Sequence, residues 1–233
     1  MNYKGTNHFL LIGWNNHKTR NTIEEILTAP VNEVVLIDTL DKSPFEHDRF
    51  HYVQGDPTDY HTLERANAAA CECVVIFAPD NVSEPILADG YTLIIATTIE
   101  SFAESIGANI YTIAEILKEH HQKNFKHAKV DEFILSQQSV SHLLANSCLQ
   151  KGSSQFFMNL LSKEGDGDLY KVDKKAHWVT YQDAFEEMLR SGAILVSDGK
   201  DTTIARRKND KIPPHAKLFV ICDNETYTKI SRS

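Results

Sequence analysis

The sequence lacks any long uninterrupted apolar run, which argues against an integral membrane protein. Its longest apolar stretches, residues 73–79 and 91–96, are far shorter than the roughly 20 residues a helix needs to cross a bilayer. No basic segment followed by an apolar one stands near Met1, so no signal peptide is expected. We therefore expect any membrane-spanning part to lie on another chain or outside this sequence.

Basic residues and cysteines are also scarce. The 24 Lys and Arg residues against 32 Asp and Glu residues give a net charge of -8 over 233 residues. A non-specific nucleic-acid partner is excluded, because binding one requires a basic face. The one close cysteine pair among the four cysteines, Cys71 and Cys73, has no second pair beside it in the sequence to complete a zinc site. A reducing, cytoplasmic compartment is the simple interpretation.

Catalytic motifs are missing as well. The sequence contains no G-x-S-x-G, no H-E-x-x-H and no phosphate-binding lysine loop. The adjacent His120 and His121 are predicted to form a solvated pair, because a metal-binding pair on a helix prefers i, i+4 spacing. We expect a protein that is not an enzyme.

What the sequence does contain is a regular alternation of strand and helix signals through residue 135. Short apolar strands separated by helical segments predict right-handed βαβ units, hence an α/β fold with a Rossmann-like, doubly wound parallel sheet. The expected strands are residues 9–12, 34–37, 51–53, 73–77, 110–113 and 133–135.

The pattern changes after Leu135. Two helical stretches follow, the second with an apolar face formed by Phe156, Phe157, Leu160 and Leu161. A Gly- and Asp-rich linker at 164–168 leads to a small α+β lobe, with a helix at 182–190 that ends before Gly192. In that lobe, strands are expected at 169–172, 193–196, 203–206 and 217–221. The predicted domains are therefore an N-lobe at 1–138, crossover helices at 139–163 and a C-lobe at 164–233.

Polar residues gather where the predicted parallel strands end, which is where open sheets bind ligands. We predict a ligand- or nucleotide-binding cleft there, formed by Gly13, Asn15, Asp38, Asp56 and Asp80. Glu115 and Asp80 follow neighbouring strands and form a candidate metal pair, because divalent cations prefer carboxylate oxygens. Two alternatives stay open: Asp38 as a helix cap or solvated side chain, and Glu115 as the opening residue of the next helix.

The first turn departs from a dinucleotide-binding loop. Trp14 and Asn15 follow Gly13 where G-x-G-x-x-G requires small residues beside a pyrophosphate. Tight NAD binding is disfavoured, although Asp38 stands where a ribose-binding carboxylate belongs. An adenosine-type ligand stays open.

An ordered series of segments resembles the RCK domains, regulators of potassium conductance. The similarity extends over about residues 8–230. Because the chain lacks the glycine-rich loop, it is more similar to the channel-attached branch of the family, found in prokaryotic ligand-gated potassium channels. The segments that carry it are HFLLIGW at 8–14, VVLID at 34–38, VQGDPT at 53–58, LERAN at 63–67 and IAE at 113–115.

The resemblance implies a cytoplasmic domain at the inner face of the cell membrane that senses a small ligand and gates a potassium channel. The domains would pair through the crossover helices, burying the Phe156 to Leu161 face, and assemble as an octameric gating ring. An intrachain core is the alternative for that face. The pore would lie on the same polypeptide or on a partner chain and would provide the only membrane contact.

In this family, the calcium site has one acid at the end of the fourth strand and two more acids after the fifth strand, with one residue between them. Glu115 matches one of them, but Ala78 and Leu117 stand where the others belong. Ca²⁺, another divalent cation or an adenine nucleotide therefore all stay open as ligands. The alternative functions are a stand-alone nucleotide-binding regulatory subunit of a potassium transporter and an NAD-dependent oxidoreductase.

Overall fold

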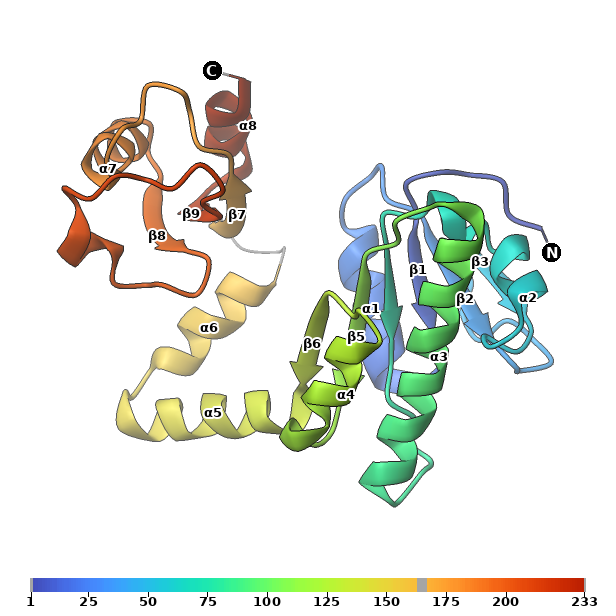
Figure 1. Ribbon diagram of the computed structural model, residues 1–233. Helices are drawn as coiled ribbons and strands as arrows, with labels where there is room; N and C mark the ends of the chain where they lie inside the picture. The colour runs from blue at the N-terminus through green and yellow to red at the C-terminus, as the bar shows by residue number, and fades with distance from the viewer. Residues whose placement is uncertain (1, 163–166, 233) are drawn as a thin grey trace. The chain divides into compact units, whose positions relative to one another are not determined.

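The N-terminal part of the chain is built on one parallel sheet. In the computed structural model, which describes residues 2–162 and 167–232, six strands pair in the order β3-β2-β1-β4-β5-β6 (Figure 1). All five pairings are parallel, so the strand order reverses between β1 and β4 as in a doubly wound fold. The predicted fold class is confirmed. The strands are β1 (Phe9–Ile12), β2 (Val34–Asp38), β3 (Phe50–Gln54), β4 (Cys73–Ile76), β5 (Thr112–Ile116) and β6 (Glu132–Leu135).

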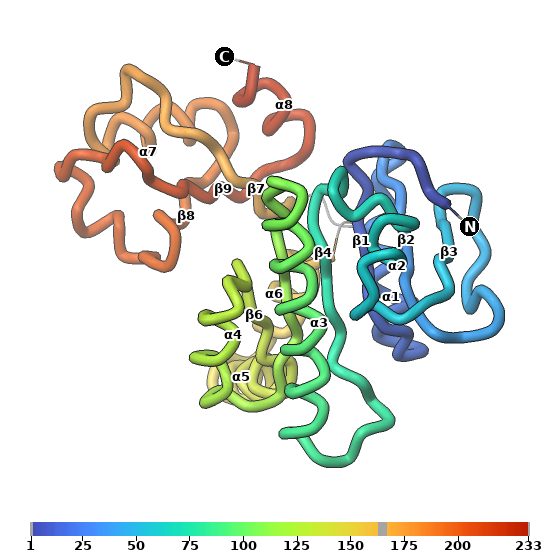
Figure 2. The backbone as a smooth tube through the Cα atoms, turned by 45° about the vertical axis from the view of Figure 1, so that its right-hand side comes forward, coloured from blue at the N-terminus to red at the C-terminus, as the bar shows by residue number. Residues whose placement is uncertain are grey.

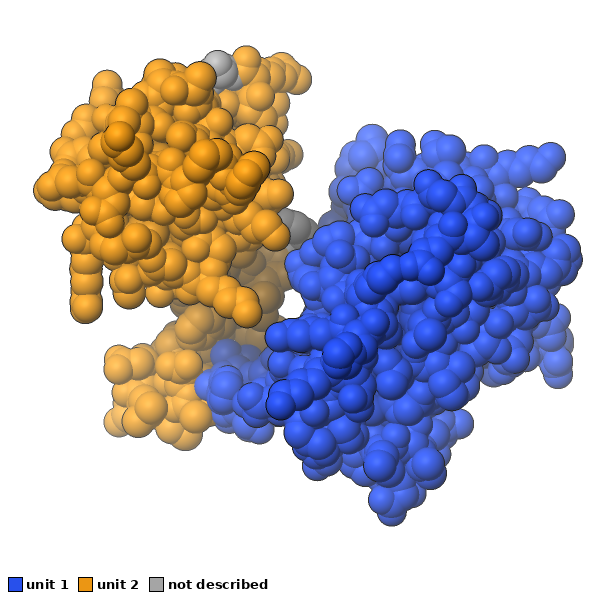
Figure 3. All heavy atoms as spheres, viewed as in Figure 1, with its two compact units in different colours: residues 1–144 blue, residues 145–233 orange. Residues whose placement is uncertain are grey.

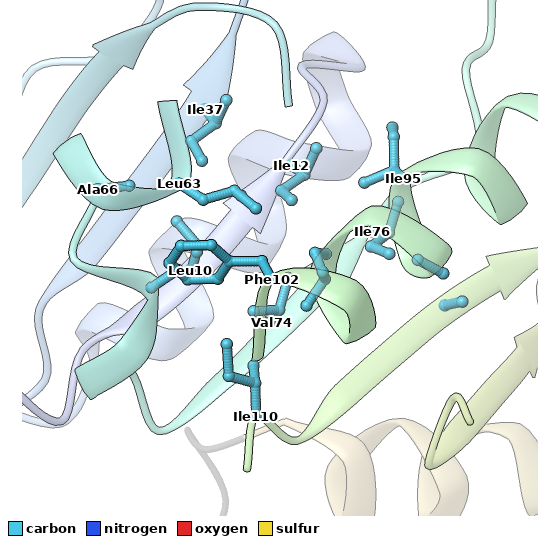
Figure 4. Packing of buried hydrophobic residues seen from close by; sticks show 14 of the residues in the cluster. Leu10, Ile12, Ile37, Leu63, Ala66, Val74, Ile76, Ile95, Phe102 and Ile110 are labelled. Carbon is cyan, nitrogen blue, oxygen red and sulfur yellow. The ribbon is translucent and has the colours of Figure 1, made fainter. Parts of the chain in front are cut away.

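Both faces of this sheet bury apolar side chains because consecutive strand residues point in opposite directions. Leu11 of β1 packs on the side of helix α1 (Asn16–Leu27), whereas Leu10 and Ile12 belong to the cluster on the other face. That second face is covered by α2 (Tyr60–Arg65) and α3 (Pro85–Ile106). Figure 4 shows side chains that meet there, among them Leu10, Ile12, Ile37, Leu63, Val74, Ile76, Ile95 and Phe102.

Helix α3 is the longest helix in the described ranges, and it runs along β4 and β5 (Figure 2). It is the one described helix that is long and apolar enough to span a membrane, and 44% of its apolar stretch is buried in this structure. A core helix of a doubly wound fold has the same length and composition. The sequence prediction considered only unbroken apolar runs and missed this segment.

Strand β5 lies later in the chain than predicted, at Thr112–Ile116 instead of 110–113. Glu115 is consequently inside the strand, and only 7% of the residue is exposed. The alternative in which Glu115 opens the next helix is therefore wrong. The strand continues because Ala114 and Ile116 still face the buried core, so the apolar alternation extends past the predicted end.

The crossover consists of two helices, α5 (Ser136–Leu149) and α6 (Ser153–Leu161), joined through Gly152 at a φ of 92°. Neither helix contains a buried residue. Each carries large apolar side chains that are more than half exposed, among them Val140, Leu144 and Leu149 on α5 and Phe156, Met158 and Leu161 on α6.

The C-terminal part has its own antiparallel sheet, in the order β7-β9-β8, and its own core around Trp178 and Met188. The predicted strand at 203–206 is wrong: residues Ile204–Arg207 form a 3-10 turn. Asp201 accepts hydrogen bonds from the backbone and the hydroxyl of Thr203, both at 2.7 Å, and such local side-chain bonds favour a turn over a strand. The elements here are β7 (Asp168–Val172), α7 (Tyr181–Arg190), β8 (Ile194–Asp198), β9 (Leu218–Cys222) and α8 (Asn224–Arg232).

The chain divides into two compact units, residues Met1–Leu144 and Ala145–Ser233 (Figure 3). This division falls inside α5, whereas the predicted boundaries, at 138/139 and 163/164, follow the ends of the crossover. Most of the predicted linker, residues 164–166, lies outside the described residues; Asp168 begins β7.

Candidate functional site

The candidate site lies at the carboxyl ends of the parallel strands and has two halves. We call the end of β1 and β2, around Asp38, the open half, and the end of β4 and β5, around Glu115, the bridged half. In the open half, Asp38 Oδ2 accepts the backbone N–H of Trp14 at 2.7 Å, and Oδ1 accepts that of Leu40 at 3.1 Å. Asp38 is thus neither a helix cap nor a merely solvated side chain, because it joins the first turn to the end of β2.

The charge of Asp38 is not matched by a cation. Among the described residues, no Lys, Arg or His forms an ion pair with it. Burial, followed by the carboxylates of Asp38 and Asp41, raises the pKa of Tyr52 to about 12. Each Asp38 oxygen has one backbone partner, so a lone pair on each stays available for a ribose hydroxyl.

A small cavity of about 30 Å³ lies beside Asp38. Gly13 lines it at a φ of 95°, a backbone conformation that L side chains rarely adopt. A cavity of this size is too small for an adenine ring, and Tyr91, which is 44% exposed, is one of its lining residues. Burial, Asp56 and Asp38 raise the pKa of Tyr91, which places its hydroxyl within the field of both carboxylates. The other lining residues are Ile12, Ile37, Thr39, Pro57, Phe77 and Ile95.

Asp56 has a local partner. Its Oδ1 accepts the backbone N–H of Thr58 at 2.8 Å and the Thr58 hydroxyl at 2.7 Å. These bonds shape the turn before α2. The Asp56 carboxylate affects the cleft through its electrostatic field, which contributes to the raised pKa of Tyr91.

The bridged half is organised by a residue that the sequence prediction did not include, Lys18. Its Nζ lies 2.8 Å from Glu115 Oε2 and 3.0 Å from Asp80 Oδ1. The same ammonium donates to the carbonyl of Ala78 at 3.3 Å. The structure therefore brings together the two predicted metal ligands, Glu115 and Asp80, with the cation of a lysine between them.

Asn15 completes the bridged half. Its side-chain N–H donates to the carbonyl of Ala78 at 2.6 Å, and its oxygen accepts the backbone N–H of Asp80 at 3.3 Å. Glu115 Oε2 accepts the backbone N–H of Ala78 at 2.9 Å. Asn15 thus ties the first turn to the end of β4, in the place where a glycine loop would leave room for a pyrophosphate. The arrangement does not form a dinucleotide phosphate cradle.

Burial alone would lower the pKa of Lys18, but hydrogen bonds to Glu115 and Asp80 outweigh it and raise that pKa. Lys18 is therefore a cation throughout the physiological range. No group of three or more His, Cys, Asp or Glu residues suited to hold a metal occurs in residues 2–162 and 167–232.

A second polar cluster, also missed from the sequence, joins α3 to the segment after β5. Asp89 is 2% exposed and accepts the backbone N–H groups of Leu117 at 2.8 Å and Lys118 at 3.1 Å. His121 Nδ1 lies 2.6 Å from Asp89 Oδ2, so the prediction of a solvated histidine pair is wrong for His121. No periodicity could have found this contact, since the two residues are 32 positions apart.

The predicted interface residues divide between two sides of α6. Phe156 and Leu161 are 56% and 73% exposed, whereas Phe157 and Leu160 are half-buried. The rings of Phe156 and Phe157 lie 5.5 Å apart, edge to face. Two of the four predicted interface side chains are thus more than half exposed.

The doubly wound sheet, the strand-end cleft and the separate α+β lobe define a Rossmann-like domain with a small C-terminal lobe. A family model described as "TrkA-N domain" matches residues 9–136, more than half of the chain. The chain belongs to this TrkA-N family, and the predicted relation to RCK domains is confirmed.

Known proteins extend this relation to potassium channels. The "Putative potassium channel protein YugO" of Bacillus subtilis (strain 168) is 33% identical over 144 residues, which are 61% of this chain and 42% of that protein. The human SLO3 gating ring has the same fold, with a TM-score of 0.69 at 12% identity over 96% of this chain and 46% of that one. A structure named "GsuK channel bound to NAD" covers 97% of this chain and 38% of the GsuK chain, at 16% identity and a TM-score of 0.48. The chain thus spans less than half the length of each of these proteins.

Proposed function

We propose that this chain is a cytoplasmic, non-catalytic regulatory domain that senses a small ligand and gates a potassium channel as part of an octameric ring of its own copies. The main support is the surface of the crossover. Two helices without a buried residue, each with exposed large apolar side chains, require a partner surface in a folded, soluble assembly.

For the ligand we propose an adenosine-type nucleotide in the open half of the cleft. Within residues 2–162 and 167–232, Asp38 forms no ion pair, and each of its oxygens keeps a lone pair beside Gly13, which suits two ribose hydroxyls. The adenine would take the place opened by movement of Tyr91. A divalent cation at Glu115 and Asp80 has weaker support, because Lys18 already neutralises part of their charge.

A ring of such domains would turn weak binding into strong gating. Shifting a two-state equilibrium from 1:99 to 99:1 takes roughly 5.5 kcal/mol of differential binding energy. Shared over eight copies, this is under about 1 kcal/mol for each site. Outward movement of Tyr91 on α3 is the conformational change that ligand entry would couple to the ring.

The assembly is tested by light scattering on the purified chain. We expect a mass well above the 26.3 kDa of one copy, and a shift towards the monomer when Phe156 and Leu161 are both changed to Asp. Val31→Asp is the matched control, because Val31 is 86% exposed and lies outside the crossover. A wild-type chain that stays monomeric at high concentration would contradict the ring.

The ligand is tested by thermal unfolding with adenosine, ADP, ATP and NAD. Binding to the folded state alone stabilises it by about 2.7 kcal/mol at a ligand concentration 100 times Kd. We expect stabilisation by at least one adenosine-containing ligand and its loss in Asp38→Asn. Absence of any shift with all four ligands would rule out the proposed sensor, whatever the oligomeric state.

A further inference from the structure

The bridged half gathers oxygen atoms around a single cation. Four oxygens from three residues surround one point: both oxygens of Glu115, at 2.8 and 3.0 Å, Asp80 Oδ1 at 3.0 Å, and the carbonyl of Ala78 at 3.3 Å. Carboxylate and carbonyl oxygens are the kind of ligand that hard divalent cations prefer, and water completes their shell of six or more. The group at the centre, however, is the ammonium of Lys18.

The position of Lys18 in its own helix is unfavourable. It is the third residue of α1, and the first turn of that helix contains no acidic residue. A positive charge at a helix N-terminus opposes the helix dipole. Local preference therefore argues against a lysine here, and such a conflict is expected where a tertiary contact requires the residue.

Glu115 is the tertiary contact that requires a lysine at position 18. The residue is 7% exposed, and a buried carboxylate without a compensating charge is strongly destabilising. One bond from the Ala78 backbone satisfies part of Glu115 Oε2 but supplies no net charge. A cation beside Glu115 is what allows this carboxylate to stay ionised.

We infer that the ammonium of Lys18 is the permanent cation of this oxygen cluster and keeps divalent metal ions out of it. A tethered cation is always present at its site, whereas a free ion must reach it from solution. Lys18 is thus a specificity-determining residue: with it the cluster is closed to Ca²⁺, Mg²⁺ and Mn²⁺, and without it the oxygens form a site for them. The inference holds whether or not Asp38 binds a nucleotide.

The test compares the wild type with Lys18→Met and with the double variant Lys18→Met/Glu115→Gln. Thermal unfolding of the full chain is measured in chelator and in millimolar Ca²⁺, Mg²⁺ or Mn²⁺. We expect no specific cation effect on the wild type. Lys18→Met should unfold roughly 6–12 °C lower in chelator and recover much of this loss with a divalent cation. The double variant should not respond to cations. Lys123→Met, an exposed lysine on α4 (Gln122–His127), is the control.

Electron paramagnetic resonance of Mn²⁺ gives a second readout that does not depend on Lys18→Met being well folded. We expect the wild type to bind no Mn²⁺ at this cluster, so Glu115→Gln should leave the amount of bound Mn²⁺ unchanged. Lys18→Arg keeps the positive charge and should also bind no Mn²⁺ at the cluster. One wild-type Mn²⁺ site lost in Glu115→Gln would overturn the inference. A folded Lys18→Met that responds to cations no more than the double variant would also overturn it.

Discussion

The two halves of the strand-end cleft each contain a carboxylate, but they differ in whether a cation compensates its charge. Each places a carboxylate in the carboxyl-terminal part of an interior strand, Asp38 in β2 and Glu115 in β5. Asp38 is held by two backbone N–H groups and keeps its charge unmatched beside a small cavity. Glu115 is almost fully buried, and an ammonium lies against it.

The difference shows that burial decides which carboxylate needs a cation. Backbone N–H groups satisfy lone pairs without neutralising charge, which suffices for a half-buried side chain in contact with water. A carboxylate withdrawn from water requires a countercharge. The open half can therefore take part in ligand binding, whereas the bridged half is committed to holding β1, β4 and β5 together.

The largest effect should come from Lys18→Met. Removing one member of a buried ion pair typically costs about 3–5 kcal/mol, because the other charge is left uncompensated. Because the Lys18 side chain is 31% exposed, we expect a loss near the lower end of this range in the free energy of unfolding measured with urea. Glu115→Gln/Lys18→Met should be more stable than Lys18→Met alone. If Lys18→Met lost less than about 1 kcal/mol, a surface pair would describe the contact better.

Asp38→Asn should have an intermediate effect on stability and a large one on ligand binding. The amide can still accept one backbone bond, so we expect a loss of about 1.5–3 kcal/mol, the range of a hydrogen bond to a charged group. Loss of the charged contacts to a ribose should lower nucleotide affinity about 10- to 100-fold. Calorimetric titration measures the affinity. Equal binding by the wild type and Asp38→Asn would place the ligand elsewhere.

Asp80→Asn should have a small effect. The Asp80 side chain is 61% exposed, and exposed ion pairs contribute about 0–1 kcal/mol. Urea unfolding should therefore show a loss well below that of Lys18→Met, and high salt should reduce it further. A loss comparable to that of Lys18→Met would mean that Asp80, not Glu115, dominates the bridge.

The smallest effect is expected from pH. The folded state raises the pKa of Lys18 above its usual 10.5, so the stability it contributes is fully present below that pH and is lost as the pH rises through the folded pKa. The difference in unfolding free energy between the wild type and Lys18→Met should thus stay constant from neutral pH to about pH 10 and shrink only above it. A marked decline of this difference at pH 8 would contradict the bridge.

Much of the open half could be predicted from sequence because its residues are local to strand ends. Gly13 and Asp38 follow apolar runs, and the carboxyl ends of parallel strands meet at one edge of a sheet. Lys18 could not be predicted in this way. Its partners lie 62 and 97 positions away, and its own helix disfavours it.

The same division applies to the fold. Local patterns predicted most parallel strands and both crossover helices, but they misplaced β5 and read the Asp201 turn as a strand, because short segments are decided by tertiary partners and side-chain bonds. They also missed Asp89 and His121, which pair from different elements.

By itself, the sequence determined the doubly wound class, the acidic strand ends and the missing phosphate loop, since periodicity and turn residues act over a few positions. The tertiary structure alone decided which carboxylate is buried and which cation lies against it. Charge pairing follows distance in space, and only the packed sheet brings Lys18 of α1 to within 3.0 Å of Asp80, which follows β4, and of Glu115 in β5.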